Sequence, residues 1–298
     1  MTHSGTHTDE ALASHLPLRA NLAFAARNVL RHKARSATTV LAVLFGVVAL
    51  ILSRGFVEDT FIQLGEAIIH SQTGHLQVAM KGYFAQGAHQ PEKYLLPNPE
   101  TEQREIAAMP GVNDVMARLS FSGLLNNERA DYSILGEGIE PEKEAKLGSF
   151  LLISAGRKLT GADHYHVLIG SGVAKALKLA PGNRAIVLVS TAGGAMNTLD
   201  FEVVGVFQTF SKDYDERVIK IPLSTAQELL ATAGANTLVI SLDKTSDTDR
   251  VARALSERLA TQGQEVKTWH ELNDFYAKTV DLYNRLFGGL ELIILLMV

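Results

Sequence analysis

An apolar segment near the start of the chain predicts a membrane span. Residues 37–52 (ATTVLAVLFGVVALIL) contain no charged side chain. A transmembrane helix needs about 20 mostly apolar residues, and small or apolar flanking residues extend the segment to 36–56. Arg54 lies near the end of this predicted span, where a long basic side chain can reach the interface.

The charges around this segment predict its orientation. Basic residues precede it, and after Arg54 no Lys or Arg occurs before Lys81. Basic residues remain on the cytoplasmic side. The N-terminus is therefore expected in the cytoplasm, and the chain after Gly55 on the outer side of the membrane. A cleaved secretory signal is the alternative, but 36 residues before the apolar run are long for a signal.

The residues before the span predict a helix on the inner membrane surface. Apolar side chains between 18 and 35 share one helical face, and Arg19, Arg27 and Arg31 lie elsewhere. Such a basic amphipathic helix can lie on lipid or contact a cytoplasmic partner. Residues 1–17 are polar and predicted to be disordered, so a solvated tail is favoured over a metal site for its histidines, which are His3, His7 and His15.

A second apolar run occupies 286–298 (LFGGLELIILLMV). Thirteen residues are too few to span a bilayer, so the run predicts the start of a second transmembrane helix inside which the sequence stops. A buried C-terminal helix is the alternative. Glu291 would be costly inside a membrane, and we interpret it as interfacial.

Two apolar stripes at helical spacing adjoin the membrane segments. One is spaced by four, three and four residues, and the other by four, three, four and three. This period indicates one face of a helix. We expect the two helices to form a stalk that transmits motion between membrane and domain, although ordinary core-facing helices would show the same pattern. The stripes are Val57, Phe61, Leu64 and Ile68, and Leu272, Tyr276, Thr279, Tyr283 and Leu286.

The outer region, 57–285, predicts an α+β domain of two subdomains. A strand–helix–strand pattern occurs at 74–80, 100–109 and 112–123, and again at 237–243, 247–262 and 264–269. We interpret 57–120 and 223–285 as two halves of one split subdomain. The inserted part, 121–222, is β-rich, with strands expected at 131–139, 166–170, 184–190, 200–207 and 218–223. Ser224 and Gln227 suggest a capping box for a helix at 225–233 that Gly234 closes.

Composition narrows the function classes. The net charge of −4 gives no sign of a nucleic-acid surface. The absence of cysteine excludes disulfides, thiolate metal sites and a cysteine nucleophile. A mean hydropathy of +0.08 suits one or two membrane segments attached to a globular domain.

Motifs for nucleotide chemistry are missing. The pattern G-x-x-x-x-G-K-[ST] does not occur, so ATP-driven work would need a partner. The turn Gly170-Ser171-Gly172 resembles a phosphate-binding turn, but Lys175 stands where the dinucleotide pattern requires glycine. A strand-to-helix turn that needs backbone freedom explains it better.

Metal and catalytic motifs are equally weak. Asp163-His164-Tyr165-His166 lacks a third zinc ligand, and a surface turn is favoured. Asp213-Tyr214-Asp215-Glu216 lacks the twelve-residue calcium loop, and a solvated turn is favoured. Neither G-x-S-x-G nor H-E-x-x-H occurs. We predict no enzyme activity, no cofactor and no metal in this chain.

Several segments in a fixed order resemble one family, the permeases of MacB-type ABC transporters, and within it the lipoprotein-releasing Lol branch. They are NLAFAARNVLR (21–31) with Arg35, GHLQV (74–78), MPGVNDV (109–115), GEGIEPEKE (136–144), HVLIGSGVAKALKLAPGN (166–183), FEVVGVFQTFSKDYDE (201–216), IPLSTAQELL (221–230) and TWHEL (268–272). The likeness covers nearly the whole chain from about residue 18.

The resemblance implies four transmembrane helices in a bacterial inner (cell) membrane, with the outer domain, periplasmic or extracellular, between the first two. It implies a pair of permeases, identical or paralogous, working with cytoplasmic ABC ATPases, and substrate handled on the periplasmic side. It suggests that Arg27, Asn28 and Arg31 contact the ATPase or lipid headgroups, although a plain topology signal explains them equally. This sequence departs from the family pattern because it stops in the second helix.

Three functions remain open at this point. The first is a permease that releases lipoproteins or other amphiphiles, with lipid, a lipoprotein or a periplasmic carrier as further partners. The second is an FtsX-like regulator that transmits force to periplasmic enzymes. The third is a membrane-anchored binding domain. An outer domain of about 200 residues favours the transport branch.

Overall fold

The computed structural model describes residues 33–87, 90–147, 151–191 and 193–297. The chain divides into two units. One comprises residues up to Asp59 together with the segment from Tyr283, and the other comprises Thr60–Leu282. The predicted amphipathic helix lies outside the described residues, except for its last three positions.

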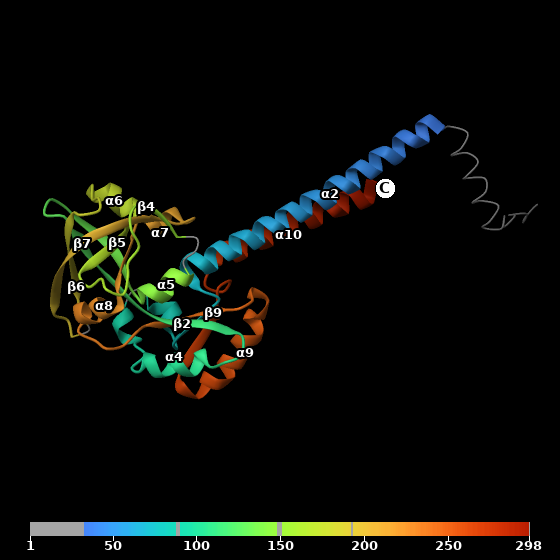
Figure 1. Cartoon of the computed structure of the whole chain (residues 1–298). Coiled ribbons are helices and arrows are strands. Elements are labelled where there is room, and N and C mark those ends of the chain that lie inside the picture. The colour runs from blue at the N-terminus through green and yellow to red at the C-terminus, as the bar shows by residue number, and fades with distance from the viewer. Residues whose placement is uncertain (1–32, 88–89, 148–150, 192, 298) are drawn as a thin grey trace, which may run out of the picture. The chain divides into compact units, whose positions relative to one another are not determined.

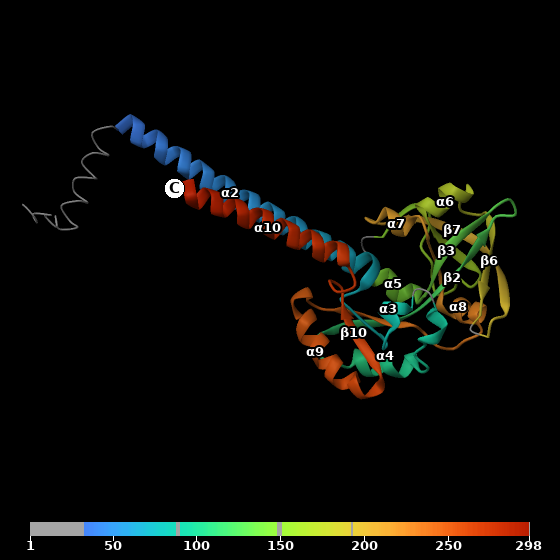
Figure 2. The same ribbon diagram turned by 180° about the vertical axis from the view of Figure 1, so that it is seen from behind.

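Two long helices supply the described part of the first unit. Helix α2 runs over Lys33–Ile68 and helix α10 over Asp274–Met297, and both views show them side by side (Figures 1 and 2). Within the described residues, the α2 segment is the one helix long and apolar enough to cross a membrane. Its apolar side chains are exposed, with Phe45 at 77% and Leu52 at 68%, as a lipid-facing surface requires.

The C-terminal apolar run is helical through Met297. Its side chains are not buried in the domain, because Leu286 is 55% exposed and Leu292 is 58% exposed. The alternative of a buried C-terminal helix is therefore wrong for these positions.

The second unit contains a four-stranded antiparallel sheet in the order β10-β1-β9-β2. With two helices between its strands it has the β-α-β-β-α-β arrangement of ferredoxin-like folds. The predicted strand–helix–strand units both form. The strands are β1 (Leu76–Met80), β2 (Val112–Asn126), β9 (Thr237–Leu242) and β10 (Gln264–Thr268), and the helices are α4 (Pro99–Ala107) and α9 (Thr248–Leu259).

Alternation along these strands decides which face the helices cover. Leu76 and Val78 share a buried cluster with Ile106 of α4 and Leu255 of α9, so both helices pack on that face (Figure 1). The opposite-facing Met116 packs with Val239 and with Leu147 of helix α5 (Pro141–Leu147). Short segments complete this region: α3 (Tyr83–Gln86), η2 (Pro91–Lys93), η3 (Thr245–Asp247) and η4 (Ala260–Gln262).

Strand β2 continues into a second group of strands that closes on itself. The order is β2-β3-β8-β5-β7, and β6 pairs with both β7 and β2. All six strands surround one apolar core, and β4 extends the far side of β7. The strands are β3 (Asp131–Ile139), β4 (Leu152–Gly156), β5 (His166–Gly170), β6 (Arg184–Ser190), β7 (Met196–Gln208) and β8 (Val218–Pro222).

Helix α8 corrects a predicted cap. It runs over Leu223–Leu230, begins after Pro222 and has no side-chain cap, so the capping box of Ser224 and Gln227 is wrong. Pro222 suits the boundary because it fixes φ, and Gln227 instead donates to the Ala233 and Gly234 carbonyls beyond the C-terminal end.

The glycine turn before helix α6 (Ser171–Leu177) also has a different cause from the one expected. Gly170 has a φ of −65°, which any residue adopts. A Cβ there would lie 2.2 Å from the Asp215 carbonyl oxygen, and one on Gly172 would lie 2.5 Å from the Glu216 Cα. These glycines let helix α7 (Lys212–Asp215) approach, so space rather than backbone freedom explains them.

Candidate functional site at the end of helix α2

Helix α2 ends in the second unit in a short π-helical turn, η1 (Ile69–Thr73). Gly74, at a φ of 66°, stops it and donates its N–H to the Ile69 carbonyl. Ile68 and Ile69 are 1% and 0% exposed. The last turn of the helix is thus held in the domain core, and π-turns of this kind often occur at functional sites.

The helix segment before this turn packs against an aromatic pair. A Cβ on Gly65 would lie 2.8 Å from the Trp269 ring, so the indole occupies the space that a larger residue would need. Trp269 lies edge-on to Tyr276 at 4.8 Å, and Tyr276 lies edge-on to Phe61 at 6.1 Å. These contacts join α2 to the first turns of α10.

The structure places the two predicted stripes as follows. On α2, Val57, Phe61 and Leu64 are half-buried and Ile68 is buried. On the second stripe the three positions up to Thr279 are half-buried, while Tyr283 is 39% exposed and Leu286 is 55% exposed.

Beside the η1 turn lies a buried cluster of four charges, the ion cluster, formed by Arg118 (β2), Glu137 (β3), Glu144 (α5) and Lys220 (β8). Their side chains are between 0% and 14% exposed. Lys220 Nζ donates to Glu144 at 2.7 Å and to Glu137 at 2.8 Å. Arg118 donates to both oxygens of Glu144, at 3.2 and 3.0 Å. The cluster is neutral overall, and Tyr214 adds a 2.9 Å hydrogen bond to Glu137.

Burial and charge compete in setting the pKa values of the cluster. Burial alone would raise the pKa of Glu144, but Arg118 and Lys220 outweigh it and lower that pKa to about 2. The pKa of Glu137 is also lowered, again against burial and by Lys220 first. Burial acts to lower the pKa of Lys220, yet the two carboxylates raise it. All four groups therefore stay charged at neutral pH.

The ion cluster is tied to the end of helix α2. Arg118 Nη1 donates to the Gln72 carbonyl in η1 at 2.6 Å. His70, also in η1, lies 3.2 Å through Nδ1 from the Leu147 carbonyl at the end of α5. Helix α5 also carries Glu144 of the ion cluster. Displacement of η1 would therefore strain both the hydrogen bond from Arg118 and the contact between His70 and α5.

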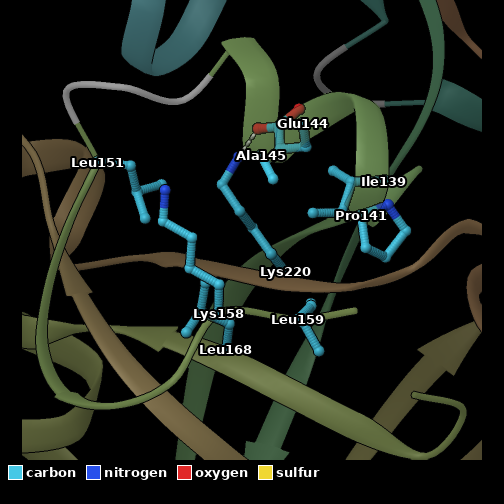
Figure 3. Close-up of a pocket in the computed structure, with 9 residues that line it drawn as sticks. All are labelled: Ile139, Pro141, Glu144, Ala145, Leu151, Lys158, Leu159, Leu168 and Lys220. Atoms are coloured by element: carbon cyan, nitrogen blue, oxygen red, sulfur yellow. Dashed lines mark hydrogen bonds and ion pairs between the residues drawn. The ribbon is translucent and has the colours of Figure 1, made fainter. Parts of the chain in front are cut away.

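Helix α5, Lys220 and Lys158 line a small cavity whose other walls are apolar (Figure 3). Its volume is about 20 Å³, room for about one water molecule. Figure 3 shows the Lys220 side chain pointing towards Glu144 of α5. The cavity is too small for a substrate, so the ion cluster has the character of a structural joint rather than a binding pocket.

A hydrogen-bonded chain fixes the other side of η1. The Leu242 N–H donates to His75 Nδ1, so the neutral ring carries its proton on Nε2 and faces Thr245 Oγ1 at 3.1 Å. Thr245 donates to Glu66 at 2.7 Å, and Glu66 lies 3.3 Å from His70. Burial, with a smaller contribution from His70, lowers the pKa of His75 to about 4, which keeps it neutral at physiological pH.

The surface turn expected at 163–166 forms, with His164 and Tyr165 exposed, although Asp163 itself is buried. The solvated turn expected at 213–216 needs correction, because these residues belong to the short helix α7 and its end. Asp163 is 6% exposed and binds Arg157 at 2.6 and 2.7 Å as well as Thr160. Asp215 is 3% exposed and accepts from the Thr209 N–H and hydroxyl. Buried carboxylates need such partners. In the part of the chain that the structure describes, no group of three or more His, Cys, Asp or Glu residues could hold a metal ion.

The remaining candidates lie elsewhere. Glu291 on α10 pairs with Arg54 on α2. Arg27, Asn28, Arg31 and the three tail histidines lie outside the described residues.

Sequence reasoning missed the ion cluster. The available signal was a single charge within an otherwise apolar strand, as in VMARL around Arg118 and VIKIP around Lys220. A charge at such a position is either exposed on one face or paired inside, and only the three-dimensional pairing distinguishes the two.

The apolar helix and the mixed α+β domain define a membrane-anchored chain with a large extracytoplasmic domain. The model of one family, the MacB-like periplasmic core domain, matches residues 36–258, about three quarters of the sequence. The chain belongs to this family, and it is a MacB-type ABC transporter permease. Permeases of this type work with cytoplasmic ABC ATPases.

Solved structures with similarity to this chain include the periplasmic region of MacB from Actinobacillus actinomycetemcomitans. It has 14% identity and a TM-score of 0.49, over 72% of this chain and 95% of that one. The extracellular domain of the ABC-type transporter YknZ from Gram-positive bacteria has 16% identity and a TM-score of 0.46, over 65% of this chain and 99% of that one. A domain of a putative permease protein from Porphyromonas gingivalis has 13% identity and a TM-score of 0.41, over 66% of this chain and 89% of that one. With these scores below 0.5, membership rests on the family match.

Proposed function

We propose that this permease couples ATP hydrolysis in a partner subunit to movement of its extracytoplasmic domain, and that the movement releases lipoproteins or other amphiphiles from the membrane. The observation that supports this proposal is the continuous attachment of α2 to the domain. Helix α2 runs without a break from Lys33 to Ile68, and Ile68 and Ile69 are buried at its end.

A rotation or axial shift of α2 would reach the domain through two routes. One is the packing of Gly65 on Trp269 and of Trp269 on Tyr276. The other is the pair of contacts from η1 to Arg118 and Leu147. Packed cores respond to such shifts as units because they are dense and resist compression. We also propose the division into a split subdomain (57–120 and 223–285) and an inserted one (121–222), with two permeases acting together.

The test uses the native complex in lipid nanodiscs, with its ATPase and both permease copies. ATP turnover is measured with and without a triacylated lipoprotein, and lipoprotein release is measured separately. Trp269→Ala removes the indole that contacts Gly65 and Tyr276. Tyr165→Ala is the matched aromatic control, since Tyr165 is 46% exposed in the inserted part.

We expect Trp269→Ala to leave the complex assembled and basal turnover within about twofold. Release per ATP hydrolysed should fall at least about fivefold, because the removed side chain weakens a packed contact without removing the helix. Tyr165→Ala should leave both rates unchanged. If wild-type turnover and release do not respond to lipoprotein at all, the proposed substrate is wrong and an FtsX-like regulatory role is favoured. If Trp269→Ala releases normally, the proposed route is wrong.

A further inference from the structure

Strand β2 has a gap in its pairing. On one edge it pairs with β9 from Val112 to Arg118 and then with β6 from Gly123 to Asn126. Between these stretches, no strand in the described part of the chain pairs with residues 119–122 on this edge. Their other edge is paired with β3 throughout. The gap is four residues long, about 13 Å at the usual rise of a strand.

The backbone groups of this gap point in a known direction. The Arg118 carbonyl accepts from the Asn236 N–H at 2.9 Å, and the Ser120 N–H donates to the Asn236 side chain at 2.8 Å. Alternate residues of a strand present their backbone groups to the same edge. Ser122 therefore also presents its N–H and C=O to the open edge. The Asn236 side chain thus takes the place of one strand partner at Ser120, and the pairing on this edge does not continue to Ser122.

A cavity of about 350 Å³ lies at this gap, within the size range of ligand sites. Its inner walls include Leu119 and Phe121, which are 1% and 3% exposed. Exposed residues at Ser122 and Ser190 mark its opening. It is separate from the ion cluster and from the η1 turn.

The lining of this cavity selects a chemical class of occupant. The lining contains both hydroxyl-bearing residues and apolar ones: Ser120, Ser122, Ser190, Thr191 and Thr232, and Leu95, Leu119, Phe121 and Leu230. Among the described residues of the lining, Glu92 is the one that carries a charge. A neutral ligand with alternating polar and apolar groups and a repeating hydrogen-bond pattern fits, and an extended polypeptide has these properties.

We propose that this gap binds a short, uncharged, extended segment of a partner polypeptide, which adds to β2 opposite β3 and fills the missing part of the ladder between β9 and β6. Main-chain hydrogen bonds to the Ser120 carbonyl and to the N–H and carbonyl of Ser122 give the affinity, since the Ser120 N–H is already bonded to Asn236. Alternate side chains face the apolar floor and the hydroxyl-lined walls. The site does not depend on the transported substrate, because it is defined by the β2 register and the cavity alone.

The test measures binding to the full chain in nanodiscs by fluorescence anisotropy. The probe is a labelled, N-acetylated and C-amidated hexapeptide of alternating Val and Ser. The matched control peptide carries N-methyl groups on alternate residues, which removes the donors that a ladder requires. Hydrogen exchange of residues 119–122 is followed with each peptide.

Three variants distinguish binding at this site from nonspecific binding. Ser190→Trp fills the opening and should raise the Kd at least about tenfold, which corresponds to about 1.4 kcal/mol. Ser122→Pro removes the open-edge N–H without taking a donor from the β3 ladder, and should raise the Kd about three- to tenfold. Ser122→Ala keeps that N–H, and its Kd should stay within about twofold of the wild-type value. Far-UV circular dichroism and the Tm confirm that each variant is folded.

Saturable binding of the Val–Ser peptide, weak binding of the N-methylated one and slower exchange at 119–122 would support the proposal. Equal binding of both peptides, or no saturable binding by the wild-type chain at millimolar peptide, would overturn it and leave a water-filled cavity. These measurements use no ATP. A failure of the transport proposal would therefore leave their result unaffected.

Discussion

Two arrangements of opposite charges in this chain have different surroundings. The ion cluster joins four charges inside the extracytoplasmic domain, with side chains that are at most 14% exposed. Arg54 and Glu291 form a single pair between the two long helices, with side chains that are 64% and 49% exposed. The first set has several partners per charge, and the second has one.

The difference in burial and in the number of partners determines how much each arrangement can contribute to stability. Buried charges carry a large desolvation cost and persist only when each has partners on several sides, so the ion cluster depends on all of its members. A pair at the membrane interface, where we place Arg54 and Glu291, gains little free energy because water and lipid headgroups screen or replace the partner. We therefore expect the ion cluster to act as a unit that fixes β2, β3, β8 and α5 together, and the Arg54–Glu291 pair to adjust the helix contact only slightly.

The largest expected effect comes from removing the arginine of the cluster. Arg118→Met leaves two buried carboxylates with one lysine, and should lower the free energy of unfolding by about 3–5 kcal/mol. It also removes the bond to the Gln72 carbonyl. The measurement is chemical denaturation of the chain in detergent. The control is Arg250→Met, whose pair with Asp247 has side chains that are 58% and 32% exposed, and a loss within about 0.5 kcal/mol is expected.

A double substitution sharpens the comparison by testing whether the cluster behaves as a unit. Lys220→Met and Glu144→Gln each unbalance the cluster, whereas the double variant restores neutrality with Arg118 and Glu137, whose nearest atoms are 3.8 Å apart. The double variant should be at least about 1–2 kcal/mol more stable than the sum of the single losses predicts. Additive losses would show that the four charges act independently.

Acid should weaken the ion cluster. Glu144 has its pKa lowered to about 2 in the folded chain, against an ordinary value of about 4.3. A carboxyl of this kind stabilises the fold fully above its unfolded pKa, and the contribution is lost as the pH falls towards its folded pKa. The Tm should be steady from about pH 5 upward and fall below about pH 4.5.

Glu144→Gln is the control for that profile. Its Tm should be lower at neutral pH but should decline less steeply below about pH 4.5, because the titrating group is gone. If the Tm of Glu144→Gln falls with pH as steeply as that of the wild type, the acid sensitivity comes from other carboxylates. Asp163 is one candidate, because its hydrogen bond with Arg157 lowers its pKa more than burial raises it.

The smallest expected effect is at the helix pair. Arg54→Gln or Glu291→Gln should change the stability of the chain in nanodiscs by about 1 kcal/mol or less. The exchanged pair, Arg54→Glu with Glu291→Arg, should recover most of any loss. A loss comparable with that of Arg118→Met would mean that the pair lies in surroundings as dry as those of the cluster, and the contrast would disappear.

Local patterns predict most of the elements. Alternation and turn residues place the strands at 131–139, 166–170 and 184–190 with the bounds that the structure has, and they predict both strand–helix–strand units. The capping box at Ser224 fails because a local motif competes with the neighbouring Pro222, which fixes where the helix begins.

The site is harder to predict because it depends on long-range pairing. Arg118 and Lys220 come from strands about 100 residues apart, and they meet through β3. The closing of the second group of strands depends on β6 pairing with both β7 and β2, which no local pattern encodes. The burial of Asp163 and Asp215 is not visible in the sequence because the residues around them are polar. The partners that allow their burial, such as Arg157 and Thr209, come into place only on folding.

The long strand β2 also sets an order of events during synthesis. Its second half can pair with β3 and β6 once about residue 190 has emerged from the ribosome, but its first half must wait for β9 at Thr237–Leu242. Contacts distant in sequence form late, and chains fold as their segments emerge. The closed group of strands in the inserted part also needs β8 at Val218–Pro222, which emerges before β9. It can therefore close while residues 112–118 of β2 still lack their β9 partner.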